Sequence, residues 1–318
     1  MKNLKIFGIF SIISACVSVT SSSFATTEYI MKKVNGEFHS FPIVNVTILP
    51  TSFKVKKEEP SNRSGTVQNL MTAIENQGQL GTCATFASVG AVERYFSKPL
   101  SEECLLRYRG GFNGDLPMYV TADIAKYGLV DPIMETENGV DYNCAYSDAI
   151  DNQDISENDY NALTNDHGHY GKSFQFLNDN DTGIYSGGDL VDAILGDDGK
   201  SFDYIRDQID HGNPVVIGVA VPDSLDESKA FLGGNGQHTI DATPSDTCSW
   251  QAVHAGDHVA NARYPGHAII LVAYDDAQQM FTFKNSWGTS WGYEGYGHIS
   301  YDYMKSYRWG PTTVVGNH

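Results

Sequence analysis

The chain has 318 residues, with 39 acidic against 21 basic side chains and a formal net charge of −18. This excess of negative charge disfavours DNA, RNA and anionic lipid as partners, because their phosphates would be repelled. The length fits one large two-lobed domain better than three separate domains.

Residues 1–25 have the pattern of a signal peptide: a positively charged start, an apolar run over residues 6–19 and a small-residue cleavage site at 23–25. The mature protein is therefore expected to be secreted, either extracellular or periplasmic. An alternative is a lipid anchor, because residues 13–16 resemble a bacterial lipobox ending in Cys16. No other segment is apolar enough to span a membrane, which takes about 20 residues.

Residues 26–65 form a short mixed leader before the main domain, which we expect at 66–318. Apolar and polar residues alternate over 43–49 and predict a strand that ends at Pro50. As a hypothesis, this strand covers the functional cleft as a plug.

Two helices are expected in the first half of the domain. Over residues 83–96, Phe86, Val89 and Val92 recur at helical spacing and predict one buried face. Residues 118–127 form the second helical candidate.

Residues 148–198 contain twelve acidic residues and one basic residue, with few apolar residues in a regular period. We interpret the acidic insert, 145–200, as a surface insertion or long loop. Residues 178–189 fall near calcium-loop spacing, but the first ligand would be Asn178 where Asp is needed. A solvated loop is the better interpretation, and we predict no metal and no cofactor.

The last third of the chain is rich in β-structure, with strands expected at 214–221, 268–274 and 280–283. Helices followed by strands indicate an α+β protein of two packed halves. The helical half is expected at about 66–200 and the β-rich half at about 201–318.

A candidate nucleophile stands at the start of the first helix. Gln77 lies six residues before Cys83, with glycines between them. The N–H groups and dipole of a helix N-terminus favour a thiolate, which is the reactive form of cysteine. A side-chain amide nearby can donate a hydrogen bond to an oxyanion as it forms.

The β-rich half supplies a base for this thiol. His267 opens one expected strand and Asn285 closes the next, with a turn centred on residue 276 or 277. In an antiparallel hairpin the residue numbers of each pair add up to the same value, which the turn determines. His267 should therefore face position 285 or 287. Trp287 lies on the same strand face as Asn285 and could shield their hydrogen bond from water.

These segments, in this order, resemble the papain-like cysteine peptidases. The matching segments are Gln77 to Ala87, the Gly-His-Ala at 266–268 and the Lys-Asn-Ser-Trp-Gly-Thr-Ser-Trp-Gly at 284–292. The Leu-Ser-Glu at 100–102 and the Gly-Phe-Asn-Gly at 111–114 resemble two further family segments.

The resemblance implies a papain-like fold, in which a helical lobe packs on a β-barrel-like lobe with the active-site cleft between them. It implies that Cys83 is the nucleophile, His267 the acid/base and Asn285 the residue that orients it, while Gln77 shares the oxyanion hole with the Cys83 N–H. The substrate-binding residues that it implies are Asn113, Gly114, Asp115, Gly266 and Trp287.

The chain departs from the family pattern at several positions. Leu80 and Phe112 replace two cysteines that form a family disulfide, and we expect an apolar contact between them instead. Asp115 replaces a glycine that lets the substrate backbone approach closely, which favours a basic or small substrate group.

One nucleophile among the four mature cysteines leaves three, so at most one bridge can form among them. The resemblance implies that the bridge is Cys104–Cys144, which leaves Cys248 free.

The expected function is a secreted cysteine endopeptidase that acts on protein or peptide substrates as a monomer. An exopeptidase, or an amidase acting on isopeptide or cell-wall peptide bonds, would use the same chemistry. The other alternative is an inactive papain-like binding protein.

Overall fold

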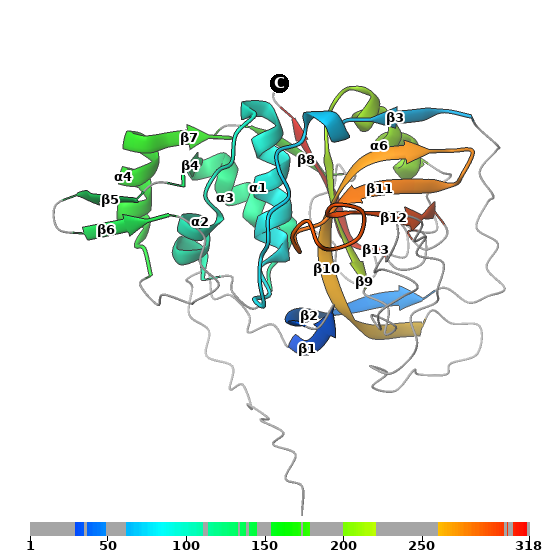
Figure 1. Cartoon of the computed structure of the whole chain (residues 1–318), viewed down its shortest axis with the longest axis horizontal. Helices are drawn as coiled ribbons and strands as arrows, with labels where there is room; N and C mark the ends of the chain where they lie inside the picture. The colour runs from blue at the N-terminus through cyan, green and yellow to red at the C-terminus, as the bar shows by residue number, and fades with distance from the viewer. Residues whose placement is uncertain are drawn as a thin grey trace, which may run out of the picture.

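The structure is a computed structural model (Figure 1). It describes residues 29–34, 37–48, 62–110, 114–132, 134–137, 140–144, 154–172, 174–178, 200–220, 260–301, 304 and 308–316. Its helices are α1 (Cys83–Phe96), α2 (Glu102–Arg109), α3 (Pro117–Tyr127), α4 (Glu157–His167), α6 (Lys200–Asp210) and the 3-10 turn η1 (Gln68–Leu70). Its strands are β1 (Tyr29–Val34), β2 (Glu37–Ile48), β3 (Ser64–Thr66), β4 (Leu129–Val130), β5 (Met134–Glu137), β6 (Val140–Asn143), β7 (Gly168–Tyr170), β8 (Gln175–Asn178), β9 (Val215–Ala220), β10 (Ala260–Asp275), β11 (Met280–Lys284), β12 (Tyr296–Ser300) and β13 (Arg308–Gly316).

The main sheet is built around the long strand β10. Its strand order is β1-β2-β10-β9-β13-β8, and β11 and β3 also pair with β10. The first part of β10 pairs with β2, and its last part pairs with β11. In Figure 1, helices α1 to α4 lie on one side and the sheet with α6 on the other, with α1 between the two halves. The molecule therefore has the expected α+β architecture.

Helix α1 is the buried element that joins the two halves. Every residue from Cys83 to Glu93 is buried, because one side of the helix packs on β10 and the other on α2 and α3. Gly90 allows this close approach, since a Cβ there would lie 3.1 Å from Ile270 Cδ1. The helices expected at 83–96 and 118–127 are confirmed, the second as α3.

The β10–β11 hairpin is also confirmed. Ile270 pairs with Lys284, and Tyr274 pairs with Phe281, with a bulge between these pairs. The bulge shifts the register by one residue. Near the open end of the hairpin, the residue numbers of each pair therefore add up to 554, as they do for Ile270 and Lys284. Extended past the end of β11, this register would set His267 opposite position 287, the second of the two predicted partners.

The described part of the acidic insert is not a long loop, so that alternative was wrong. It contains α4, β7 and β8. Tyr160 and Leu163 lie three residues apart on α4 and are buried. Ser156 caps the helix, because its hydroxyl accepts from the Asp159 N–H at 3.2 Å. A capping residue followed by a short apolar spacing predicts a helix, but the acidic composition hid this signal.

The boundary between the two halves also differs from the sequence estimate. Strand β8 pairs with β13, so a segment of the expected helical half belongs to the sheet, and β3, at the boundary between the leader and the main domain, pairs with β10. Both pairings join residues far apart in sequence, which periodicity does not reveal.

Cys104 and Cys144 form a disulfide, with their Cα atoms 5.0 Å apart. This pairing is the one that the resemblance implied, and it ties α2 to the segment after β6. Cys16 and Cys248 lie outside the described residues, as does most of the possible calcium loop. Among the helices of the described residues, none combines the length and apolar character needed to cross a bilayer.

Candidate active site

Cys83 is the first residue of α1, and its side chain is buried with 2% exposure. Backbone N–H groups of Ala268, Ala84 and Cys83 itself point to the sulfur and lower the pKa of the thiol. Burial has the larger effect, so the pKa rises from 9.0 to about 11. The Ala268 contact places the sulfur beside strand β10, next to His267.

His267 and Asn285 lie side by side, as the hairpin predicts. The His267 Nε2–H donates to Asn285 Oδ1 at 2.7 Å, and the Ser286 N–H donates to the same oxygen at 2.8 Å. This fixes the imidazole tautomer, so Nδ1 is the nitrogen that can exchange a proton with a thiol. The Trp287 ring stacks on the imidazole with centroids 4.5 Å apart, which excludes water from the hydrogen bond.

Burial also determines the charge of the histidine. His267 is 1% exposed, and the loss of solvent lowers its pKa from 6.5 to about 4, against the opposing hydrogen bond to Asn285. Burial thus opposes the charged form of both the thiol and the imidazole, so formation of an attacking thiolate depends on the hydrogen bonds that the site supplies.

Gln77 is held at both ends of its amide. Its Nε2 donates to the Leu80 carbonyl at 2.7 Å, and its Oε1 accepts from Ser286 Oγ at 2.6 Å. The Gln77 N–H also donates to the Ser286 carbonyl at 2.8 Å. Sequence reasoning missed the role of Ser286, although it lies inside the segment that carries the family resemblance.

The leader lies over the site through residues 39–41, which sequence reasoning also missed. His39, Ser40 and Phe41 are all at least 95% buried. The Phe41 ring meets His267 and Trp287 edge-on, with centroids 6.2 and 5.8 Å away.

Polar contacts fix the same segment of the leader. His39 Nδ1 bonds to the Gly78 carbonyl at 2.9 Å, and the Ser40 N–H donates to the Gln79 carbonyl at 2.9 Å. Residues 43–48 of the strand in the plug hypothesis pair with residues 260–265 of β10, directly before Gly266 and His267.

The expected substrate-binding residues are placed in part. Gly114 has a positive φ of 116°, a conformation that suits glycine. The Asp115 carboxylate pairs with Arg109, and Gly266 directly precedes His267 on β10. Asn113 and Phe112 lie outside the described residues, so the expected contact between Leu80 and Phe112 is untested.

A charge cluster lies farther along α1 than Cys83, near the close contact of Gly90 with β10. Carboxylate oxygens of Glu75, Glu93 and Glu102 lie within 4.8 Å of one another, and Lys284 is the cation beside them. Lys284 Nζ donates to Thr72 Oγ1 at 3.1 Å, and that hydroxyl donates to Glu93 at 2.5 Å.

Burial and the neighbouring carboxylates raise the pKa values of two members of this cluster. The pKa of Glu93 rises to about 7, and that of Glu102 rises well above its usual range. Glu93 is therefore partly protonated at neutral pH, which reduces the repulsion within the cluster.

Solved structures of cysteine proteases resemble the chain. Xylellain, a cysteine protease from Xylella fastidiosa, is 15% identical, with 86% of this chain and 96% of that chain covered and a TM-score of 0.50. The digestive procathepsin L2 proteinase of Tenebrio molitor is 17% identical over 83% of this chain and 70% of that chain, with a TM-score of 0.47. The likeness to xylellain shows a shared fold.

An uncharacterized peptidase C1-like protein of Acanthamoeba polyphaga mimivirus is 41% identical over 39 residues. The match spans only 12% of that relative's length.

The model of the Peptidase_C39 like family matches residues 70–312. This range begins before Gln77 and ends within β13, so it includes the whole of the site described above. Because the match covers most of the chain, the chain belongs to the Peptidase_C39 like family, and it has the fold of the cysteine protease xylellain.

Proposed function

We propose that the protein is an endopeptidase that hydrolyses peptide bonds through Cys83, His267 and Asn285. The observation that carries this proposal is the 2.7 Å bond from His267 to Asn285 beneath Trp287, with Cys83 at a helix N-terminus beside the same strand. A nucleophile, a base and a group that orients the base are the parts that thiol catalysis needs.

In the first half of the reaction, Cys83 gives its proton to Nδ1 of His267, and the sulfur attacks the peptide carbonyl carbon. The carbonyl π electrons move to oxygen, and the Gln77 amide and the Cys83 N–H stabilise this oxyanion. His267 then protonates the amine as the C–N bond breaks, which leaves a thioester on Cys83.

In the second half, a water molecule attacks the thioester carbon, and His267 takes a proton from that water. The oxyanion forms again, the C–S bond breaks, and the proton returns to the sulfur. Asn285 keeps the imidazole in the tautomer that both halves require.

The test is hydrolysis of peptides with an internal quencher and both ends blocked. Cys83→Ala should lower the rate at least about 1000-fold, because no other group can form the thioester. Cys248→Ala is the matched cysteine control and should retain activity. Cleavage by the Cys83→Ala variant at the rate of the wild type would exclude this function.

We further propose that the leader inhibits the enzyme until it is removed or displaced. The support is the burial of His39, Ser40 and Phe41, with the His39 ring against Trp287 and the Phe41 ring against His267 and Trp287. A substrate carbonyl needs the space that the Phe41 ring occupies beside His267.

The same segment supports one alternative, an exopeptidase. If the leader stays bound beside Trp287 and Gly78 while only part of it moves, one end of the cleft remains closed. A cleft closed at one end accepts only chain termini. Faster cleavage of peptides with a free terminus than of doubly blocked peptides would favour this alternative.

We also propose that the protein is exported, on the basis of the charged start and apolar run of residues 1–25. The Cys104–Cys144 disulfide supports this, since disulfides persist in oxidising compartments. A periplasmic or culture-medium fraction that contains chains starting near residue 26 would test it, whereas labelling by a fatty acid would indicate the lipid anchor at Cys16.

A further inference from the structure

A small pocket lies beside the catalytic asparagine, between α1, β10 and the end of β11. Its volume is about 10 Å³, which is the size of a single water site. Apolar side chains of α1 and β10 form part of its wall, among them Ala87 and Ala268. The polar residues that line it are Glu75, Lys284, Asn285 and Ser286.

The amide of Asn285 has a hydrogen-bonded end and an unsatisfied end. Its Oδ1 accepts from His267 Nε2 and from the Ser286 N–H. Its Nδ2 is buried and has no hydrogen-bond partner among the residues that the structure describes. A buried N–H group without an acceptor costs about 1–3 kcal/mol. Because two donors fix Oδ1, the amide cannot turn over to avoid this cost, and the pocket is the place from which an acceptor can reach Nδ2.

Backbone hydrogen bonds fix Glu75 beside the segment that follows Asn285. The Gly288 N–H donates to the Glu75 carbonyl at 2.9 Å, and the Gln77 N–H donates to the Ser286 carbonyl at 2.8 Å. The carboxylate of Glu75 belongs to the charge cluster described above. The pocket wall therefore carries both the unsatisfied donor and an anionic acceptor, each held in place by its own backbone.

The other two carboxylates of the cluster are not in this position. Neither Glu93 nor Glu102 is among the residues that line the pocket. Both oxygens of Glu93 are already used, since Oε1 accepts from the Leu100 N–H at 2.6 Å and Oε2 accepts from Thr72 Oγ1 at 2.5 Å. Within the described part of the cluster, Glu75 is the carboxylate that can act on Asn285.

We propose that the pocket binds one ordered water molecule, which accepts a hydrogen bond from Asn285 Nδ2 and donates one to the Glu75 carboxylate. A water molecule suits the place because it accepts and donates at once, and buried waters make about 2–4 such bonds. Through this water, Glu75 is a positioning residue that holds the Asn285 amide in the orientation in which Oδ1 meets His267. The inference rests on the proposed function, because it assigns Glu75 a part in orienting the catalytic base.

The first test is a high-resolution crystal structure of the wild type, which needs no activity. We expect a water molecule in the pocket at about 2.7–3.2 Å from Asn285 Nδ2 and in contact with the Glu75 carboxylate. A pocket without a water molecule, or a protein atom that accepts directly from Nδ2, would overturn the proposal.

The second test compares Glu75→Leu with Glu75→Gln, each in the full chain so that the leader contributes equally. Both changes remove the charge, but only Gln keeps a carbonyl oxygen that can accept from the water. In Glu75→Leu the kcat for a quenched peptide should be about tenfold lower with little change in KM, because a loosened Asn285 impairs the reaction and not substrate binding. Glu75→Gln should recover most of this loss.

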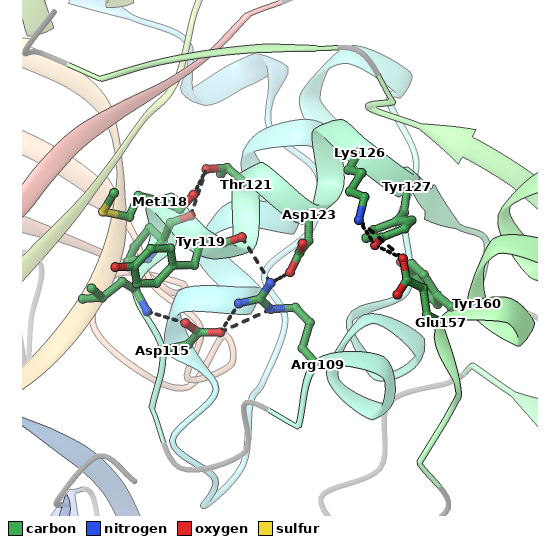
Figure 2. A network of polar contacts seen from close by, with 12 residues as sticks. Arg109, Asp115, Met118, Tyr119, Thr121, Asp123, Lys126, Tyr127, Glu157 and Tyr160 are labelled. Carbon is green, nitrogen blue, oxygen red and sulfur yellow. Dashed lines mark hydrogen bonds and ion pairs between the residues drawn. The ribbon is translucent and has the colours of Figure 1, made fainter. Parts of the chain in front are cut away.

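Glu157→Gln is the matched control, because it makes the same change at an exposed carboxylate of α4 (Figure 2). Its kcat and KM should equal those of the wild type. Equal losses of kcat in Glu75→Leu and Glu75→Gln would assign the effect to charge and contradict the proposal, as would a normal kcat in Glu75→Leu.

The NMR signal of the His267 Nε2–H reports on the bond to Asn285 without turnover. It should shift and exchange faster with solvent in Glu75→Leu and should return toward its wild-type position in Glu75→Gln. If Glu75→Leu does not fold, the wild-type crystal structure still decides. A wild type that cleaves no peptide, yet holds the water and shows these shifts, would contradict the peptidase function and leave the positioning of Asn285 by Glu75 in place.

Discussion

Ser286 helps to determine which way the amide of Gln77 points. Its hydroxyl donates to Gln77 Oε1, and Nε2 donates to the Leu80 carbonyl at the other end of the amide. Without this bond the amide could rotate and present its oxygen to the oxyanion, which would repel it. An oxyanion hole works only when its donors are already in place.

We therefore expect Ser286→Ala to lower kcat about tenfold with little change in KM, because the hydrogen bond acts mainly in the transition state. Ser290→Ala, an exposed serine of the same segment, is the control and should match the wild type. A Ser286→Ala variant with normal kcat in a peptide cleavage assay would show that the amide keeps its orientation without the hydroxyl.

The His267–Asn285 contact could be predicted because both residues belong to one hairpin. Its geometry depends only on local pairing. Arg109 and His39 could not be recognised in the same way, since each makes its contacts with another segment. Asp115 looked like a free acid in the sequence, and only the position of Arg109 shows that its carboxylate is already paired.

At the level of whole elements, the sequence predicted those with strong periodicity. Helix α3 and the β10–β11 hairpin have buried faces that repeat at regular spacing, and the large apolar residues of α1 recur at helical spacing although the helix is buried all round from Cys83 to Glu93. Helix α4 was missed because its buried face is narrow and its other residues are mostly polar. Stable packing of such a helix depends on its neighbours more than on its own sequence.

The charge cluster beneath α1 gives a prediction for stability. The pKa of Glu93 is about 7 in the folded protein against an ordinary value of 4.5, owing to burial and then to Glu75. Between these two pH values the folded state holds a proton that the unfolded state has lost. The contribution of Glu93 to the free energy of unfolding is therefore fully present below pH 4.5 and is lost as the pH rises toward 7.

Glu93→Gln removes this titration, because the amide has no proton to lose. As the pH rises from 5 to 8, the free energy of unfolding of the variant should increase by about 1–3 kcal/mol relative to that of the wild type. Urea unfolding at the two pH values measures this gain. The exposed Glu157→Gln variant is the control, and its free energy of unfolding should differ from that of the wild type by the same amount at pH 5 and pH 8. If the difference for Glu93→Gln is also the same at the two pH values, Glu93 does not titrate in this range.

In the whole molecule, the leader is part of the main sheet. Strand β2 pairs with β10 over residues 260–265, and the same long strand then carries His267. The sequence indicated a strand in the leader but not its partner, because pairing between segments more than 200 residues apart leaves no local signal. Docking on β10 brings residues 39–41 over the site as a direct consequence.

This arrangement predicts that weakening the leader contact activates the full chain. Phe41→Ala removes a ring buried against His267 and Trp287, a loss of about 2–3 kcal/mol in the covered state. Peptide hydrolysis and Cys83 alkylation should both become about 30- to 150-fold faster, since the site is uncovered more often.

Met31→Ala is the matched control, because Met31 belongs to the same leader but is exposed. Its rates should equal those of the wild type. A Phe41→Ala variant that folds with the wild-type melting temperature yet reacts no faster would mean that the leader does not limit access. A variant that loses activity would instead make residues 39–41 part of the working site, as the exopeptidase alternative requires.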